Sequence, residues 1–166
     1  FVAANNLAGE NGCRFSIVRY GNVMGSRGSV IPFFFKLIRE GATELPITDP
    51  TMTRFWITLT QGVDLVVRTF SDMSGGEIFV PKIPSMRLLD LAKALAPEIG
   101  HKIIGIRPGE KLHEMMISPD DARQTYEMKD YYVIKPAFVF WSRHQDCALE
   151  QANQVSDGFQ YTSDQN

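Results

Sequence analysis

Short apolar runs recur along the chain, and many of their members are β-branched or aromatic. Runs of this length and composition predict strands. They lie at residues 15–18, 45–48, 54–57, 77–80, 102–106 and 131–134, with a further candidate at 138–140. Between them lie segments whose apolar positions recur every three or four residues, which predicts helices. The alternation of the two patterns indicates an α/β architecture.

Three helices are predicted between these strands. The first has Pro32 in its first turn and is closed by Gly41. Thr60 is expected to cap the second helix. The apolar face of the second helix consists of Val63, Val66, Val67 and Phe70. Residues 85–96 are expected to be an extended piece running into the third helix, whose apolar positions are Leu88, Leu91, Ala92 and Leu95.

The two ends of the chain differ from its middle. Residues 1–7 have the pattern of the end of a helix, without an initiator methionine, so we interpret the chain as the later part of a longer protein. The last residues are rich in Gln, Asn, Ser and Asp, which predicts a polar, mobile or loosely docked tail. The expected division is one folded region over residues 1–141 and a tail over residues 142–166.

Composition narrows the classes of function. The 166 residues are 44% hydrophobic and 22% charged, which suits one globular domain. A formal net charge of −2 argues against general binding to nucleic acid or to an anionic membrane. Cys13 and Cys147 stand far apart and are expected to be reduced thiols. The three histidines lack the spacing of metal ligands, so no metal is predicted.

Glycines at 21, 25 and 28 follow a predicted strand and raise the possibility of a dinucleotide phosphate loop. We expect ordinary turns instead, because residues 29–32 separate the loop from the next helix, and the next extended piece contains Pro46. The loop nonetheless leaves the carboxyl end of a strand, where α/β sheets place ligands.

Two arginines are candidates for binding an anion. Arg54 is embedded among large apolar residues and needs an anionic partner, which an acidic side chain of the protein could also provide. Arg107 ends an apolar strand and precedes a Pro-Gly turn and a predicted charged helix start at residues 109–114, in which His113 is expected to be solvated. A guanidinium holds phosphate through paired hydrogen bonds, and a carboxylate such as Glu110 can accept from a ribose hydroxyl.

Five motifs in order carry a resemblance to one family. They are FSIVRYGNV at residues 15–23, GSRGSVIPF at 25–33, RFWI at 54–57, FVPK at 79–82 and RPGEKLHE at 107–114. From residue 1 to about residue 138, the chain resembles the C-terminal half of inverting UDP-N-acetylglucosamine 4,6-dehydratases. These enzymes form part of the polysaccharide-biosynthesis family of extended short-chain dehydrogenases. The resemblance implies the end of a Rossmann-type parallel sheet joined to a small α/β substrate-binding region.

The resemblance also implies a chemistry. In this family of lyases, the cofactor takes a hydride to make a 4-keto sugar, which acidifies the C5 proton. Water then leaves from C6, and the hydride returns there with inversion at C5. The cofactor is NADP, with NAD as the other possibility, and the full-length protein is expected to be a cytoplasmic homo-oligomer. The family's catalytic residues lie on segments ahead of residue 1, so no catalytic residue is predicted here and the chain alone is expected to be inactive.

Binding residues are implied by position in the motifs. Tyr20, Asn22 and Val23 would border the nicotinamide. The residues expected to contact the UDP-sugar are Asn22, Val30, Pro32, Phe33, Ile47, Arg54, Arg107 and Glu110. Among these, the two arginines would hold the diphosphate and Glu110 the ribose.

Two other functions fit the same residues. A UDP-sugar 4-epimerase of the same superfamily shares the hydride step and could share both arginines. A nucleotide-binding module without catalytic activity would bind UDP but would not turn it over.

Overall fold

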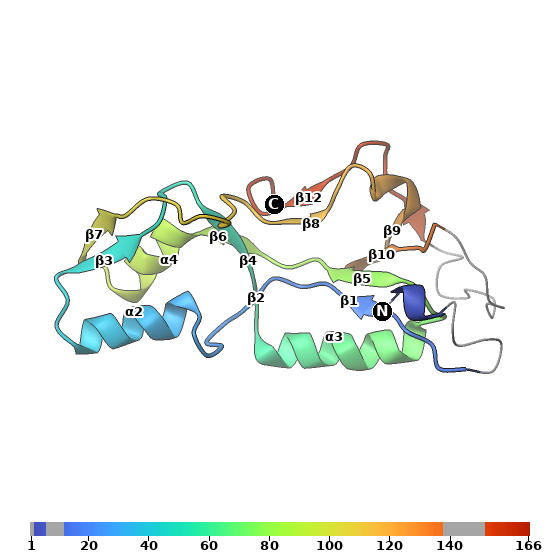
Figure 1. The fold of residues 1–166 in the computed structure, drawn as a ribbon, viewed down its shortest axis with the longest axis horizontal. Helices are drawn as coiled ribbons and strands as arrows, with labels where there is room; N and C mark the ends of the chain where they lie inside the picture. The colour runs from blue at the N-terminus through green and yellow to red at the C-terminus, as the bar shows by residue number, and fades with distance from the viewer. Residues whose placement is uncertain (1, 6–11, 138–151) are drawn as a thin grey trace. The chain divides into compact units, whose positions relative to one another are not determined.

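The computed structural model describes residues 2–5, 12–137 and 152–166, and most of its helices and strands are labelled in Figure 1. The chain forms two compact units. The first unit combines Phe1–Tyr20, Thr60–Lys82 and Met116–Tyr161, and the second combines Gly21–Leu59, Ile83–Met115 and Thr162–Asn166. The boundary predicted between residues 141 and 142 lies outside the described residues, as does the strand predicted at 138–140.

The first unit is built on a mixed sheet. Within the described residues its strand order is β1 (Ile17–Val18), β5 (Ile78–Pro81), β10 (Tyr131–Ile134), β9 (Thr125–Glu127) and β11 (Asn153–Gln154). β1 runs parallel to β5, whereas the remaining pairs are antiparallel. Short 3-10 helices lie at Val2–Ala4 and Ala122–Gln124. The predicted α/β class is confirmed, although antiparallel strands extend the parallel pair.

Helix α3 (Leu59–Asp72) buries its less apolar side within the first unit. Its buried residues are Gly62, Leu65 and Thr69. The predicted apolar face is exposed instead, up to 79% for Phe70. Thr60 is also not the cap, because the helix already begins at Leu59. Which side of α3 is buried therefore depends on how the helix packs in the fold, and the hydrophobic pattern alone did not reveal it.

We expect Phe70→Glu to reduce self-association of the protein, because exposed apolar faces promote aggregation and Phe70 is the most exposed large apolar residue of α3. Surface changes of this kind alter folding stability by only about 0.5 kcal/mol. Gln61→Glu is the matched control, since it adds the same charge to an exposed position of α3 without removing apolar surface. Light scattering after gel filtration measures the effect, and equal association of the two variants would contradict the expectation.

Tyr131 joins β10 to α3 within the first unit. Its hydroxyl donates to Asp72 Oδ2 at 3.0 Å, and Arg68 lies 4.8 Å from its ring centroid. Burial, followed by the hydrogen bond to Asp72, raises the pKa of Tyr131 above its ordinary value of 10.0. The folded protein therefore keeps this proton after the unfolded chain has lost it.

This shift predicts a loss of stability in alkali. The contribution is fully present below about pH 10 and is lost as the pH rises through the raised pKa of Tyr131. In Tyr131→Phe the free energy of unfolding is expected to fall less steeply as the pH rises, because phenylalanine has no proton to lose. Denaturant midpoints measured at several pH values give the slope, and an identical slope in both proteins would refute this origin.

The second unit contains two small sheets and two helices. One sheet has the order β2 (Asn22–Val23), β4 (Thr53–Ile57), β6 (Ser85–Arg87), and the other pairs β3 (Glu44–Ile47) with β7 (Gly100–Ile103). β2 is parallel to β4 and β3 is parallel to β7, whereas β6 is antiparallel to β4. The helices are α2 (Val30–Arg39) and α4 (Leu88–Leu95), close to their predicted ranges.

The core of the second unit lies where α2 and α4 pack on β3 and β4. Phe34 of α2 and Leu45 of β3 are completely buried, and Trp56 of β4 and Ala92 of α4 belong to the same cluster. Pro32 stands in the first turn of α2, and Gly41, with a φ of 81°, follows its end. The core thus fixes the starts of α2 and α4 relative to β4.

Residues 152–166 differ from the predicted loosely docked tail. β11 pairs with β9, and the buried ring of Tyr161 lies 5.3 Å from that of Tyr132. β12 (Tyr161–Thr162) pairs with β8 (Met115–Ile117). Polar composition concealed these contacts because strand pairing satisfies polar backbone groups whatever the side chains. The rest of the predicted tail, residues 142–151, lies outside the described residues.

Candidate functional site

The second unit contains a cavity of about 590 Å³. Its lining comes from β2, from the loop before α2 and the first turns of α2, from β3, β4 and the loop between them, from α4 and from the segment after β7. The residues are Asn22, Gly28, Ser29, Val30, Pro32, Phe33, Phe34, Lys36, Pro46, Thr48, Met52, Arg54, Trp56, Leu88, Ile104, Arg107 and Glu110. This volume suits a small-molecule ligand.

The amino-terminal end of α2 forms one side of the cavity. Gly28, Ser29 and Val30 line it, and the amide of Phe33 donates the first bond of the helix, to Ser29 O at 3.2 Å. The amides of Val30 and Ile31 precede that first bond, as helix starts leave their first amides without intrahelical acceptors. Free amides and the helix dipole together favour an anion at this end.

Gly25 and Gly28 lie in turns, as predicted, whereas Gly21 does not, and one reason given for the prediction is wrong. Gly25 and Gly28 have φ values of 74° and 76°, and α2 opens at Val30, directly after the loop. A dinucleotide loop also requires the flanking strands to share one parallel sheet. β2 and β3 lie in different sheets, so this loop does not form a dinucleotide fingerprint.

A tight turn places Arg107 and Glu110 at the cavity. The amide of Glu110 donates to Arg107 O at 3.0 Å, and the amide of Arg107 donates to Glu110 Oε2 at 3.3 Å. Between them lie Pro108 and Gly109, whose φ of 81° suits the third position of a type II turn. These two hydrogen bonds close the turn, so that the side chains of Arg107 and Glu110 start from neighbouring points of the backbone. The Arg107 side chain is exposed.

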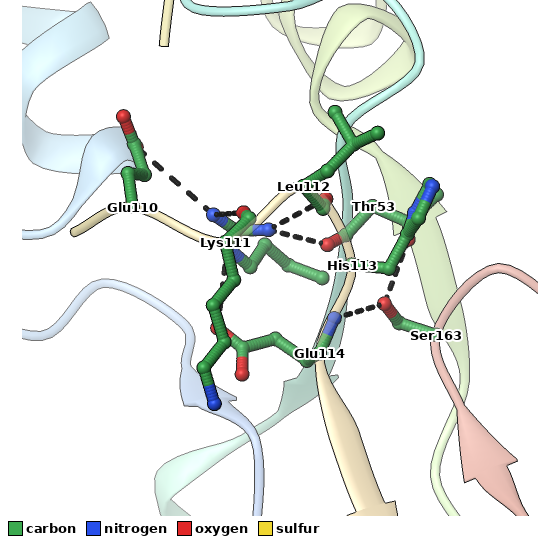
Figure 2. A network of polar contacts seen from close by, with 8 residues as sticks. Thr53, Glu110, Lys111, Leu112, His113, Glu114 and Ser163 are labelled. Atoms are coloured by element: carbon green, nitrogen blue, oxygen red, sulfur yellow. Dashed lines mark hydrogen bonds and ion pairs between the residues drawn. The ribbon is translucent and has the colours of Figure 1, made fainter. Parts of the chain in front are cut away.

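No helix follows this turn, contrary to the prediction for residues 109–114. The backbone carbonyls there accept from the guanidinium of Arg54 instead of from helical amides. Nη1 of Arg54 donates to Leu112 O at 3.1 Å and to Thr53 O at 2.7 Å, and Nη2 donates to Lys111 O at 2.7 Å. Figure 2 shows Lys111 and Leu112 in this network.

Arg54 also lies between two carboxylates. Its Nε lies 3.6 Å from Glu114 Oε1, and its Nη2 lies 4.0 Å from Glu110 Oε1, while only 12% of the Arg54 side chain is exposed. The interpretation of Arg54 as a partner of the protein's own acidic residues therefore describes this structure. Most of its donors are already used, so its main effect is to hold the segment that carries Arg107 and Glu110.

The charge of the cavity lining is predominantly positive. The lining contains three cationic side chains, Lys36, Arg54 and Arg107, and one carboxylate, Glu110. Phe33 and other apolar residues complete the lining. Lys36 is also 3.8 Å from Glu40 on the exposed side of α2, a pair that solvent weakens. An anionic ligand with a flat or apolar part fits this combination.

Seven of the residues predicted to contact substrate line this cavity. They are Asn22, Val30, Pro32, Phe33, Arg54, Arg107 and Glu110. Ile47 differs, because its side chain is 0% exposed within the core. Alternation along β3 places Pro46 and Thr48 at the cavity instead. A contact between Ile47 and the substrate stays a prediction, with the residues on either side of Ile47 at the cavity.

The residues predicted to border a nicotinamide are distributed differently. Tyr20 belongs to the first unit and is 41% exposed. Asn22 and Val23 form β2 in the second unit, where Asn22 lines the cavity and Val23 is not among the described lining residues. Asn22 pairs with Trp56 in the register of β2 and β4.

Sequence reasoning missed Lys36 and Trp56. Lys36 follows Pro32 by four positions, so the helical period already places both on one side of α2. Trp56 was expected only as part of a strand, yet it lines the cavity and its buried Nε1 has no hydrogen-bond partner in the described structure. The sequence does not show that Trp56 pairs with Asn22 across β2 and β4, and this pairing is what places Trp56 beside a cavity residue.

Neither a metal site nor a membrane span occurs in the part of the chain that the structure describes. Residues 2–5, 12–137 and 152–166 contain no group of three or more His, Cys, Asp or Glu side chains arranged to hold a metal ion. In the same ranges, every helix is too short or too polar to span a membrane.

Comparison with known proteins adds a separate line of support. The family model described as polysaccharide biosynthesis protein matches residues 1–136. A Campylobacter jejuni protein named UDP-N-acetylglucosamine 4,6-dehydratase (inverting) is 60% identical over 170 residues, covering 100% of this chain and 51% of the relative. A Rickettsia canadensis protein named UDP-glucose 4-epimerase is 42% identical over 137 residues, covering 80% of this chain and 40% of the relative.

A solved structure is also similar. The X-ray structure of Pen from Bacillus thuringiensis matches with a TM-score of 0.79 and 35% identity, over 92% of this chain and 46% of that chain. This chain spans about half the length of the curated relatives that it matches.

Proposed function

This chain belongs to the family of polysaccharide biosynthesis proteins, and on that premise we propose that its second unit binds the UDP part of UDP-N-acetylglucosamine. The protein that carries the chain would convert this sugar to a 4-keto-6-deoxy sugar with inversion at C5. The observation that supports this proposal most strongly is the cavity, in which the start of α2 and Arg107 meet beside apolar side chains.

The diphosphate would occupy the cationic part of the cavity. The first amides of α2 supply neutral donors, and Arg107 supplies a guanidinium. Arg107 is exposed, and its own backbone amide, not its guanidinium, bonds Glu110. The guanidinium thus remains well suited to a ligand. Lys36, one turn further along α2, adds positive charge to the same cavity.

The nucleoside would occupy the apolar part. Pro46 provides flat apolar surface, and Phe33 provides an exposed ring. Glu110 is an acceptor for a ribose hydroxyl, and its Oε2 is already oriented by the amide of Arg107. A carboxylate fixed in this way adds specificity for a sugar without attracting the diphosphate.

The hydride chemistry would be supplied by NADP when it is bound, with NAD as the alternative. The glycines at 25 and 28 do not provide its pyrophosphate loop, because β2 and β3 lie in different sheets. Among the residues of this chain, we propose that Tyr20, Asn22 and Val23 border the nicotinamide. Their part would be to position the sugar carbon, with the exposed amide of Asn22 also within the substrate cavity.

A second function has a specific observation in its favour. The Rickettsia canadensis relative carries the name UDP-glucose 4-epimerase, and it covers 80% of this chain. An epimerase would use the same UDP-binding residues and would return the hydride to C4, without loss of water. The two functions therefore differ in the mass of the product.

The product formed from UDP-N-acetylglucosamine distinguishes these functions. The protein that carries this chain is incubated with the sugar and NADP in deuterated water, and the product is examined by mass spectrometry and by NMR. A product lighter by one water, with deuterium from solvent at C5, supports the dehydratase. A product of unchanged mass and altered C4 configuration supports the epimerase, and binding of UDP without either product supports a non-catalytic nucleotide-binding module.

A further inference from the structure

The last residues of the chain belong to the second unit and contact its site-bearing segment. We call residues Thr162–Asn166 the C-terminal segment. At its end, Asn166 Nδ2 donates to Ile83 O at 2.8 Å. Near its start, Ser163 is only 2% exposed. A serine buried to this extent in a polar stretch needs partners for its hydroxyl.

Ser163 binds Glu114 with both its backbone and its side chain. The amide of Ser163 donates to Glu114 O at 2.8 Å, and the amide of Glu114 donates to Ser163 Oγ at 2.9 Å. These two bonds fix the backbone of Glu114, whose carboxylate lies 3.6 Å from Arg54. The C-terminal segment therefore contacts the same short segment that Arg54 holds.

The hydroxyl of Ser163 also reaches β4. It lies 2.7 Å from Thr53 Oγ1, which in turn lies 2.7 Å from His113 Nδ1. Figure 2 shows Thr53, His113, Glu114 and Ser163 in one connected network. His113 is half-buried and bonded, which corrects the prediction that it is solvated.

This network lies immediately after the turn that presents the ligand-binding side chains. Residues 111–114 are held from one side by Arg54 and from the other by Ser163, and Glu110 precedes them directly. Without the Ser163 bonds, the backbone of Glu114 would lose two of its hydrogen bonds, while Lys111 and Leu112 would keep those to Arg54. The position of the Arg107–Glu110 turn then depends on a residue more than fifty positions further along the chain.

We propose that Ser163 is a positioning residue for the nucleotide site. Its hydroxyl and amide hold Glu114 and Thr53 so that the Arg54 network keeps Arg107 and Glu110 at the cavity. The inference rests on the proposed function, because it concerns the affinity of the cavity for UDP. It assigns to the C-terminal segment a part in ligand binding, although none of residues 162–166 lines the described cavity.

The test compares Ser163→Ala with Ser156→Ala. Both variants remove one hydroxyl from the last residues of the chain, but Ser156 is exposed and serves as the control. UDP affinity is measured by calorimetry at a temperature where all proteins are folded, and amide exchange is followed by mass spectrometry over residues 110–116. Thr53→Val, which keeps volume and removes the other hydroxyl, is a second variant.

The expected result is a dissociation constant for UDP raised roughly five- to tenfold in Ser163→Ala, as the loss of a buried hydrogen bond suggests. Amide exchange should quicken over residues 110–116 while α2 and α4 keep the wild-type rate, and Thr53→Val should change both readouts in the same direction. Ser156→Ala should match the wild type in both.

Unchanged UDP affinity in Ser163→Ala would overturn the inference. So would faster exchange throughout the second unit, because the loss of affinity would then follow from general destabilisation. Failure of the proposed function would look different, since the wild type itself would not bind UDP. If the wild type does not bind UDP, the inference about Ser163 fails as well, because there is no UDP site to position, whatever the exchange data show.

Discussion

Replacing Arg54 by methionine is expected to destabilise the second unit by about 3 kcal/mol, as breaking a buried, hydrogen-bonded charge network does. Methionine retains much of the apolar stem, so the loss comes mainly from the guanidinium. The carbonyls of Thr53 and Lys111 would lose the guanidinium as donor, Leu112 O would keep only its bond from the Thr53 amide at 3.1 Å, and Glu114 would lose the cation 3.6 Å away. UDP binding should fall with stability, because the same carbonyls fix the Arg107–Glu110 turn.

Arg87→Met is the matched control for Arg54→Met. Arg87 pairs with Asp90 at 2.7 Å, a shorter distance than either ion pair of Arg54, but 57% of its side chain is exposed. Exposed ion pairs contribute at most about 1 kcal/mol. Chemical denaturation of both variants gives the comparison, and a loss of similar size in the two would show that burial of Arg54 is not the cause.

Replacing Arg107 by alanine is expected to raise the dissociation constant for UDP roughly 10- to 100-fold, since a charge-assisted hydrogen bond contributes about 1.5–3 kcal/mol. Folding stability should change little, because the side chain is exposed and the turn is held by backbone groups and Glu110. Calorimetric titration with UDP and with uridine separates the effects. The loss should be confined to UDP, because uridine has no phosphate.

Lys102→Ala controls for the loss of one positive charge. Lys102 lies exposed on β7 in the same unit and is not among the described cavity residues. Affinity for UDP should therefore stay near the wild-type value. If Arg107→Ala weakens UDP and uridine equally, or if Lys102→Ala weakens UDP as strongly, direct contact between Arg107 and phosphate is refuted.

Much of the second unit could be predicted from sequence because its signals are local. Pro32 and Gly41 bound α2, and the apolar run after Arg54 forms β4. The family resemblance is confirmed by the matched family model and by the Campylobacter jejuni relative. Motifs at the ends of strands therefore indicated many of the residues that line the cavity.

The errors have one physical cause, which is that tertiary contacts replaced local preferences. Residues 111 and 112 do not form a helix because Arg54 supplies donors for their carbonyls. α3 buries the side that carries Gly62, Leu65 and Thr69, although its other side is more hydrophobic. Ser163 is buried by partners far away in sequence, and no local pattern distinguishes it from the exposed Ser156.

The most direct test of the central claim is a calorimetric titration of UDP and of uridine into the wild-type protein at two salt concentrations. We predict saturable binding of one UDP per chain, weaker binding of uridine, and a UDP affinity that falls as salt rises, because Arg107 is exposed to screening. Absence of UDP binding, or equal affinity for UDP and uridine, would contradict the assignment of the cavity to a nucleoside diphosphate.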